Sequence, residues 1–176
     1  EDVYHPCERD EALARQAGLD GHFNVVYAGN LGAAQALGNV IAAAALVRDL
    51  ADVQFVFIGD GVEEEQLKSA AATAGLTSVR FLGRMPPQQM PPYYALADVL
   101  LVHLKDDPLF EITIPSKTIA YLASGRPILA ALKGDAAEVI HMAGAGVACQ
   151  PENPQALADG LRFLYGLSRH QRESMG

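Results

Sequence analysis

Short apolar runs alternate with longer segments of helical spacing along the chain, and the alternation repeats six times. Most of the apolar runs lack the polar alternation of a half-exposed strand, as expected of parallel strands that are buried on both faces. Successive parallel strands need right-handed helical crossovers. The pattern therefore predicts an α/β fold: a Rossmann-like open parallel sheet of about six strands with helices on both faces.

The boundaries follow from the same pattern. The predicted strands are 24–29, 54–59, 79–82, 98–104, 127–132 and 146–150. The predicted helices are 35–50, 63–74, 87–97, 116–124, 136–143 and 154–165. The first 22 residues have little periodicity apart from a possible short helix at 8–17. We therefore expect residues 1–22 to be a connector from a missing N-terminal domain, and residues 23–176 to form the domain itself.

Composition narrows the class of protein. Half of the 176 residues are apolar and 19% are charged, which excludes a disordered chain. The longest apolar stretch, 40–47, is far shorter than the roughly 20 residues that a membrane-spanning helix needs. A net charge of −8 opposes nucleic-acid binding, since that affinity depends on neutralising phosphates. Cys7 and Cys149 make no disulfide framework and suit a reducing compartment, so we expect a cytoplasmic protein.

Ligands of open parallel sheets bind beyond the carboxyl ends of the strands, so the candidate residues are sought there. Gly29 to Gly32 form a small-residue turn that would let the backbone approach an anion, or would simply make a tight turn. The second strand ends at Asp60, and the glutamates at 63–65 favour capping of the next helix over phosphate binding. Gly83, Arg84 and Met85 follow the third strand, where exposed backbone could read a base.

The segment 105–117 is the most informative, because it is long and polar. Ser116 is a plausible helix N-cap with Lys117 just inside the helix, so amides, a hydroxyl and an ammonium could converge on phosphate oxygens. Asp106, Asp107 and Glu111 could accept hydrogen bonds from sugar hydroxyls, or could be solvated loop charges. His103 lies in an apolar strand, which favours a core histidine over a ligand. No metal-ligand spacing and no covalent nucleophile is visible.

Six motifs, in this order, carry a resemblance: AGNLG, FVFIGDG, FLGR, YYALADVLLV, PSKTIAYLASGRPILA and GAGVACQPENPQALADGL. From about residue 24 to 165 the chain resembles the C-terminal, donor-binding half of retaining GT-B glycosyltransferases. The likeness is to bacterial enzymes that assemble capsule, O-antigen and colanic acid. It implies a nucleoside-diphosphate sugar as donor, with UDP preferred over GDP, and no metal or other cofactor. A saccharide or lipid-linked acceptor would be held by the N-terminal domain, at the inner face of the membrane in the full-length protein. The isolated domain is therefore expected to be inactive.

The resemblance also implies roles for individual residues. The turn at 29–32 would face the diphosphate, 83–85 would contact the base, and 112–117 would contact sugar and phosphate. The catalytic candidates are Glu111 and Lys117. The substrate-binding candidates are Gly29, Asn30, Leu31, Gly32, Gln35, Asp60, Gly83, Arg84, Met85, Phe110, Thr113, Ile114, Pro115, Ser116 and Lys117.

Two departures from the family pattern matter. Asn30 and Gln35 stand about where many relatives have Arg and Lys, so phosphate charge would fall to Lys117 and Arg84. Ile112 and Ala120 stand where many relatives carry two glutamates. Glu111 could only partly replace the first of these, and Ala120 has no acceptor for the ribose contact that the resemblance gives to the second.

Two other functions stay open. A non-catalytic nucleotide-binding module would explain the lost glutamates. A dinucleotide-binding domain of an oxidoreductase would share the sheet. However, neither glycine turn carries the third glycine of that fingerprint, because Glu64 stands where it belongs after Gly59 and Gly61.

Overall fold

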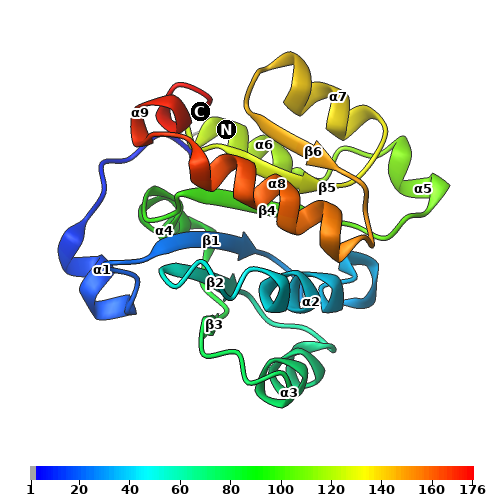
Figure 1. The fold of residues 1–176 in the computed structure, drawn as a ribbon. Coiled ribbons are helices and arrows are strands. Elements are labelled where there is room, and N and C mark those ends of the chain that lie inside the picture. Colours follow the sequence, from blue (N-terminus) through cyan, green and yellow to red (C-terminus); the bar gives the residue numbers. More distant parts are fainter. Residues whose placement is uncertain (1–2) are drawn as a thin grey trace.

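The computed structural model of the chain describes residues 3–176, which form a six-stranded, all-parallel sheet (Figure 1). The strands are β1 (Phe23–Ala28), β2 (Val53–Ile58), β3 (Val79–Gly83), β4 (Val99–His103), β5 (Ile128–Ala131) and β6 (Gly146–Cys149). Their order across the sheet is β3-β2-β1-β4-β5-β6. The direction of winding reverses between β1 and β4, and ligands of such sheets bind at the carboxyl ends of the strands at that point.

Helices and short 3₁₀ turns connect the strands. The α-helices are α1 (Glu11–Ala17), α2 (Gly38–Leu46), α3 (Glu64–Thr73), α4 (Met90–Ala95), α5 (Pro108–Glu111), α6 (Ser116–Ala123), α7 (Asp135–Met142), α8 (Pro154–Gly166) and α9 (Arg169–Glu173). The 3₁₀ turns are η1 (Ala33–Gln35) and η2 (Pro87–Gln89). No helix within residues 3–176 is long and apolar enough to cross a membrane.

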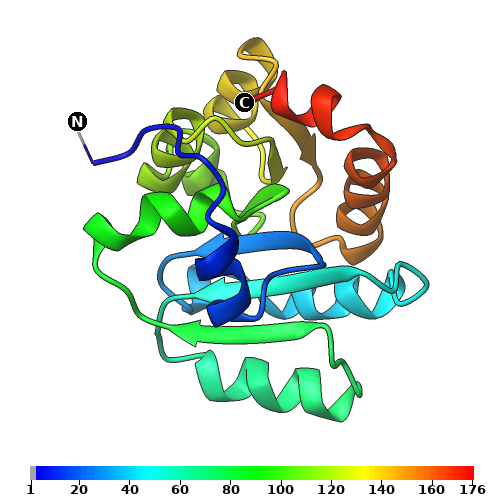
Figure 2. The ribbon, with the colours of Figure 1, turned by 90° about the vertical axis from the view of Figure 1, so that its left-hand side faces the viewer.

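Two hydrophobic clusters sandwich the sheet. One packs α2, α3 and α8 against one face, with Tyr27 and Phe57 pointing into it. The other packs α1, α4, α6 and α7 against the opposite face, with Val26 and Tyr121 inside. In Figure 2, α4 and α6 (green and yellow-green) lie to the left of the sheet, and α2 and α8 (cyan and orange) lie to the right. Burial of both faces explains why the strands lack polar alternation, and the predicted fold class is confirmed.

The predicted elements differ from the observed ones mainly in the helices. Each strand boundary is within one residue of its prediction, whereas the helix predicted at 35–50 is broken. Ala36 adopts a left-handed conformation, with φ of 47°, which ends η1 and delays α2 to Gly38. The sequence pattern also missed α5 and α9, which are four and five residues long and show no periodicity.

The segment before β1 packs onto the domain. Asp10 caps α1 by accepting hydrogen bonds from the amides of Ala12 and Leu13. Ala14 and Leu19 are fully buried in the cluster that contains α4 and α6. Residues 10–19 are thus held against the sheet by their own apolar contacts.

Candidate functional site

A pocket of about 650 Å³ opens at the carboxyl edge of the sheet. We call it the donor pocket. Most of its lining follows a strand or begins a helix. The lining residues are Tyr4, Ala28, Gly29, Asn30, Gln35, Ile58, Gly59, Asp60, Arg84, Met85, Pro87, Met90, Tyr94, Leu104, Pro115, Ser116, Lys117 and Ala120. The pocket includes the ends of β1 and β4, where the strand order reverses.

The turns after β1 and β2 are fixed to each other by the backbone. The amide of Leu31 donates to the carbonyl oxygen of Asp60 at 2.8 Å, and the amide of Glu63 donates to the carbonyl oxygen of Leu31 at 3.0 Å. Gly59 has φ of 149°, and a Cβ at this position would collide with the carbonyl oxygen of Gly29. Gly59 therefore allows the two turns to pack closely together. The packed turns form the rigid floor of the pocket.

Lys117 reaches across the end of β1 from α6. Its Nζ lies 2.5 Å from the hydroxyl oxygen of Tyr27 and 3.8 Å from the centre of the Tyr27 ring. The Tyr27 hydroxyl in turn donates to the carbonyl oxygen of Asn30 at 2.7 Å. A Cβ on Gly29 would lie 2.9 Å from Nζ, so glycine at this position makes room for the ammonium.

The ammonium of Lys117 has no carboxylate partner among residues 3–176. Burial lowers the pKa of Lys117 to about 7, because the charged form loses its hydration. A bound anion would favour the charged form again. A lysine with a structural role is normally paired with a carboxylate or exposed to water. The environment of Lys117 therefore indicates a role in binding an anionic ligand.

The first turn of α6 faces the same pocket. Its N-cap is Pro115, which offers no side-chain acceptor, so the prediction that Ser116 is the N-cap is wrong. Ser116 and Lys117 are instead the first two helical residues. Tyr121, one turn further on, fixes the helix over β1, since its hydroxyl accepts from the amide of Ala28 at 2.9 Å. The uncapped amides and positive dipole end of α6 can therefore meet an anion beside Lys117.

One side of the pocket, next to α6, is apolar and aromatic. The rings of Tyr4 and Tyr94 stack with centroids 5.8 Å apart, and Tyr94 meets Tyr121 edge-on at 5.3 Å. Met85 and Met90 complete this side. Flat rings and thioethers suit a planar aromatic ligand. Sequence reasoning missed Tyr4 and Tyr94, since neither lies near a strand end.

Arg84 and Asp60 lie at the rim of the pocket. Their closest charged atoms are 3.7 Å apart, and their side chains are 77% and 57% exposed. Such a loose, exposed ion pair contributes little to stability. Both side chains thus remain available to a ligand in the pocket.

The two aspartates of segment 105–111 have structural partners, whereas the side chain of Glu111 is exposed. Both carboxylate oxygens of Asp106 accept from Lys133 at 2.8 Å. Asp107 caps α5 by accepting from the amide of Leu109 at 2.9 Å. Glu111, the last residue of α5, is exposed, and Gly134 leaves room for its carbonyl oxygen. The turn at 105–111 is therefore held to the loops after β5 and β6 as well as to itself.

The structure brings only part of the predicted site together. The pocket is lined by Gly29, Asn30, Gln35, Asp60, Arg84, Met85, Pro115, Ser116 and Lys117. Seven candidates lie outside its lining: Leu31, Gly32, Gly83, Phe110, Glu111, Thr113 and Ile114. Leu31 is fully buried and Phe110 packs against the core. The hydroxyl of Thr113 is occupied by the carbonyl oxygen of Leu109 at 2.8 Å.

His103 is a core residue, as its apolar surroundings in the sequence predict. The side chain is fully buried, and Nδ1 lies 2.8 Å from the carbonyl oxygen of Gln35. Burial lowers the pKa of His103 to about 4, which keeps the ring neutral. Across residues 3–176, no three side chains of His, Cys, Asp or Glu are grouped so that they could hold a metal ion.

Comparison with protein families gives one match: a model described as "Glycosyl transferases group 1" matches residues 22–166. Two curated relatives are similar in sequence. The "Probable glycosyltransferase WbjE" of Pseudomonas aeruginosa is 34% identical over 132 residues, which is 74% of this chain and 32% of the relative. The "Putative colanic acid biosynthesis glycosyl transferase WcaI" of Escherichia coli K12 is 30% identical over 173 residues, which is 94% of this chain and 42% of the relative.

Solved structures share the fold. The C-terminal domain of the glycosyl transferase group 1 family protein LpcC from Francisella tularensis superposes with a TM-score of 0.80 at 20% identity, covering 98% of this chain and 90% of that one. Anabaena Alr3699/HepE in complex with UDP and glucose gives a TM-score of 0.78 at 20% identity, covering 98% of this chain and 49% of that one. The chain thus spans less than half the length of the curated relatives it matches. Its sheet is that of a GT-B glycosyltransferase domain, as the six motifs predict.

Proposed function

Because the chain belongs to the glycosyl transferase group 1 family, we propose that residues 23–176 bind a nucleoside-diphosphate sugar in the donor pocket. The full-length enzyme would transfer the sugar, with retention of anomeric configuration, to a saccharide or lipid-linked acceptor in surface polysaccharide synthesis. One observation carries the proposal: the amine of Lys117, which pairs with no carboxylate of residues 3–176, lies next to the uncapped first turn of α6.

The diphosphate lies between α6 and the turn after β1. Lys117 donates to a phosphate oxygen, the amides of Ser116 and Lys117 supply further donors, and Arg84 approaches from the rim. Asn30 and Gln35 contribute neutral amide groups. These groups stabilise the departing nucleoside diphosphate, on which negative charge accumulates as the sugar leaves.

The base lies against the apolar side of the pocket, near Met85, Met90 and Tyr94. We favour UDP over GDP, because the related Anabaena HepE is described in complexes with UDP and UDP-glucose. Among residues 3–176, Asp60 is the only acidic residue in the lining of the donor pocket. We therefore assign it to accept hydrogen bonds from the ribose hydroxyls. This role falls to Asp60 because Ala120, which also lines the pocket, has no acceptor.

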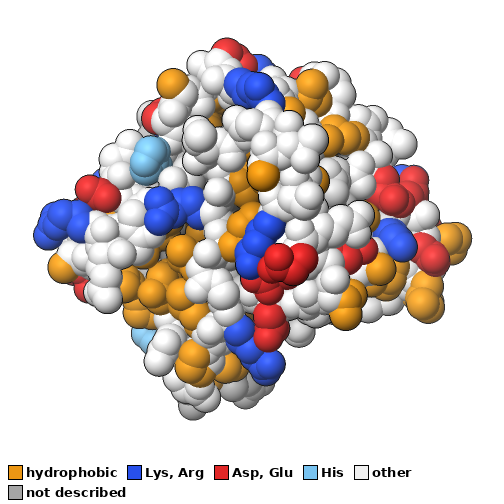
Figure 3. All heavy atoms as spheres, turned by 90° about the horizontal axis from the view of Figure 1, so that it is seen from below, with side chains coloured by type: hydrophobic (Ala, Val, Ile, Leu, Met, Phe, Trp, Pro, Cys, Tyr) orange, Lys and Arg blue, Asp and Glu red, His pale blue; other side chains and the backbone are white. Residues whose placement is uncertain are grey.

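The acceptor binds to the half of the enzyme that precedes this domain, with residues 1–22 as the connector. Four of the exposed large hydrophobic side chains lie in one segment: Leu109, Ile112, Ile114 and Ile119. The region of α5 forms the right-hand edge of Figure 3, where hydrophobic side chains stand beside acidic and basic ones. We assign this edge to contact with the acceptor half, and Glu111 to the sugar that passes between the halves. The isolated domain would be inactive, and the complete enzyme would work in the cytoplasm at the inner face of the membrane.

A non-catalytic nucleotide-binding module is the second candidate. It is favoured by the neutral side chains of Ile112 and Ala120 at the two positions where many relatives carry glutamates. Ile112 is 75% exposed and does not line the pocket, so it supplies no substitute contact. Both candidate functions require the same diphosphate site. They differ in whether the full-length protein catalyses sugar transfer.

Thermal unfolding with UDP, GDP and NADH at millimolar concentrations tests the proposal. A ligand that binds only the native state raises the midpoint of unfolding with concentration. We expect stabilisation by one nucleoside diphosphate, and loss of most of it in Lys117→Ala. Stabilisation by NADH alone would instead support a dinucleotide-binding domain. A nucleotide-sugar panel on the full-length protein then separates the transferase from the non-catalytic module.

A further inference from the structure

A second cavity, of about 300 Å³, opens at the amino edge of the sheet, at the other end of the strands from the donor pocket. We call it the arginine cavity. It is lined by the residues just before β1, β4 and β5, by α9, and by the segment around the start of α1. These residues are Arg9, Glu11, Gly21, His22, Ala97, Asp98, Arg126, Pro127, Arg169, Arg172 and Glu173. Four arginines thus meet three carboxylates, in a chain whose net charge is −8.

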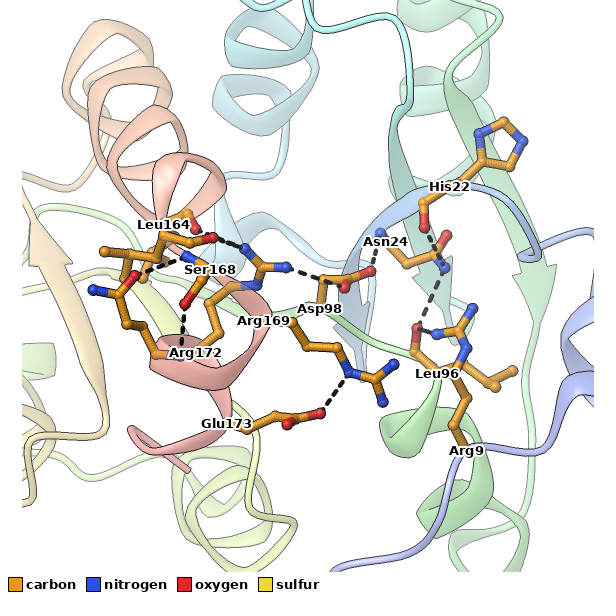
Figure 4. Close-up of polar contacts among 12 residues, drawn as sticks. Arg9, His22, Asn24, Leu96, Asp98, Leu164, Ser168, Arg169, Arg172 and Glu173 are labelled. Carbon is orange, nitrogen blue, oxygen red and sulfur yellow. Dashed lines mark hydrogen bonds and ion pairs between the residues drawn. The ribbon is translucent and has the colours of Figure 1, made fainter.

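Two of the arginines donate hydrogen bonds to carbonyl oxygens at the C-terminal ends of helices (Figure 4). Arg9 donates to the carbonyl oxygen of Leu96, after α4, at 3.0 Å. Arg172 donates to the carbonyl oxygens of Leu164 and Leu167 at the end of α8, and its guanidinium lies over the ring of Phe23. Carbonyl groups at helix C-termini attract cations, so these two side chains have structural roles.

The other two arginines keep free donors. Arg169 uses Nε to bond the carboxylate of Glu173 at 2.7 Å, and its two terminal nitrogens make no hydrogen bond to the described residues. In Figure 4 the Arg169 guanidinium points away from α9, toward the side of the cavity where Arg9 lies. Arg126 makes neither a hydrogen bond nor an ion pair with any of residues 3–176. Burial lowers the pKa of Arg126. The nearby carboxylates of Glu173 and Asp98 oppose this shift, and the charges of Arg169 and Arg9 add to it.

The three carboxylates do not neutralise this charge. Glu11 pairs with Arg9 at 3.0 Å and Glu173 with Arg169. Asp98 accepts from the amide of Asn24 at 2.9 Å and lies 3.8 Å from Arg172. Each carboxylate is therefore already matched to another cation, and Arg126 remains in excess beside the open donors of Arg169.

We propose that the arginine cavity binds a phosphate monoester through Arg126 and Arg169. A phosphate monoester offers three acceptor oxygens and up to two negative charges, so it can accept paired hydrogen bonds from two guanidinium groups at once. The strands separate this site from the donor pocket by roughly 15 to 20 Å, the length of five or six strand residues, so the two sites can be occupied together.

Nuclear magnetic resonance of the ¹⁵N-labelled chain tests the proposal. Inorganic phosphate is titrated at constant ionic strength, and the amide signals of Gly21, Asp98 and Arg126 report the arginine cavity. We expect saturable shifts of these signals, and at least tenfold weaker binding in Arg126→Gln. Arg48→Gln removes the same charge from a residue outside the cavity lining and should bind phosphate as the unmodified chain does.

A second variant is expected to bind phosphate more tightly, which a misfolded protein would not do. Glu173→Gln removes the carboxylate that competes for Arg169, and Glu173 is 42% exposed, so the change is tolerated. Phosphate affinity should rise severalfold, while Glu65→Gln, a matched change on α3, should leave it unaltered. An affinity that stays the same or falls in Glu173→Gln would contradict the proposal.

Sedimentation with vesicles identifies the source of the phosphate. Binding to phosphatidylcholine vesicles that contain phosphatidic acid, with loss in Arg126→Gln, would assign the site to a lipid headgroup. Binding of inorganic phosphate without vesicle binding would assign it to a free phosphate ester. If neither probe binds, or if both bind equally well to Arg126→Gln, the proposal is overturned.

Discussion

The two edges of the sheet hold positive charge in different ways. At the carboxyl edge, Lys117 and the first turn of α6 face the donor pocket, and no carboxylate in the described part of the chain pairs with this lysine. At the amino edge, Arg9 and Arg172 are bonded to carbonyl oxygens of helix ends, and carboxylates surround them. The difference follows from the direction of the helices, because each connecting helix begins near the carboxyl edge and ends near the amino edge.

This contrast predicts which charges serve binding and which serve stability. Helix N-termini already favour an anion at the carboxyl edge, so a single buried lysine is enough to complete a site there. Helix C-termini at the amino edge attract cations, and Arg9 and Arg172 there hold the structure. Removing a cation from each edge should therefore have opposite consequences.

The largest effect is expected from the floor of the donor pocket. In Gly59→Ala the new methyl group would meet the carbonyl oxygen of Gly29, and φ of 149° disfavours any residue with a side chain. We expect unfolding free energy to fall by at least about 3 kcal/mol in urea titrations. Gly144→Ala is the control, since Gly144 has φ of 63° but open space around it, and it should lose only about 1 kcal/mol. Equal losses would show that the two turns do not pack as described.

Arg172→Ala should reduce stability and leave nucleotide binding intact. The change removes a donor to two carbonyl oxygens of α8 and a cation beside Asp98. We expect a loss of about 2 kcal/mol in chemical denaturation. Arg162→Ala, which breaks an exposed pair with Asp49, should cost clearly less than Arg172→Ala. A weakened UDP affinity in Arg172→Ala would mean that the two edges are not independent.

Lys117→Ala should show the reverse pattern. UDP binding measured by calorimetry should weaken by about 1 to 2 kcal/mol, the contribution of a lost charge-assisted hydrogen bond. Stability without ligand should stay level or rise, because a buried ammonium without a carboxylate partner is removed. Lys133→Ala serves as the control: it breaks the pair with Asp106 outside the pocket and should leave UDP affinity unchanged. An unaltered dissociation constant in Lys117→Ala would remove this residue from the site.

The smallest effect is the pH dependence of UDP binding. The pKa of Lys117 is about 7 in the folded protein, against an ordinary value of 10.5. Between these values the folded state binds fewer protons than the unfolded state, so the lysine's contribution to stability rises with pH. Binding of the diphosphate favours the charged form, so affinity should fall severalfold as pH rises from 7 to about 8.5. If UDP affinity depends just as steeply on pH in Lys117→Ala, Lys117 is not the group responsible.

The sequence predicted the sheet well because its signal is local. The six apolar runs identify the strands to within one residue. The runs of β1, β2, β4 and β5 lack alternation because these strands are buried on both faces, whereas the edge strands β3 and β6 are only partly buried. The helix at 35–50 was wrong because the left-handed conformation of Ala36 depends on contacts that periodicity does not contain. The short helices α5 and α9 are not predicted either, because four or five residues are too few to show a helical period.

The candidate site was predictable where the residues follow strands and not elsewhere. Lys117 and the turn at Gly29 were identified from their place at strand and helix ends, although the contact of Lys117 with Tyr27 spans 90 residues. Tyr4 joins the donor pocket from the segment before α1, where no strand end points to it. The arginine cavity is not predictable in this way, because its residues precede the strands, whereas ligands of open parallel sheets are expected after them.

The most direct test of the central claim is a crystal structure of this chain with UDP. The account predicts diphosphate oxygens within about 2.7 to 3.2 Å of Lys117 Nζ and of the amides of Ser116 and Lys117. It also predicts that Nζ turns from the Tyr27 hydroxyl toward the phosphate. Diphosphate density elsewhere on the chain, or in the donor pocket but out of reach of both Lys117 and the first turn of α6, would contradict it.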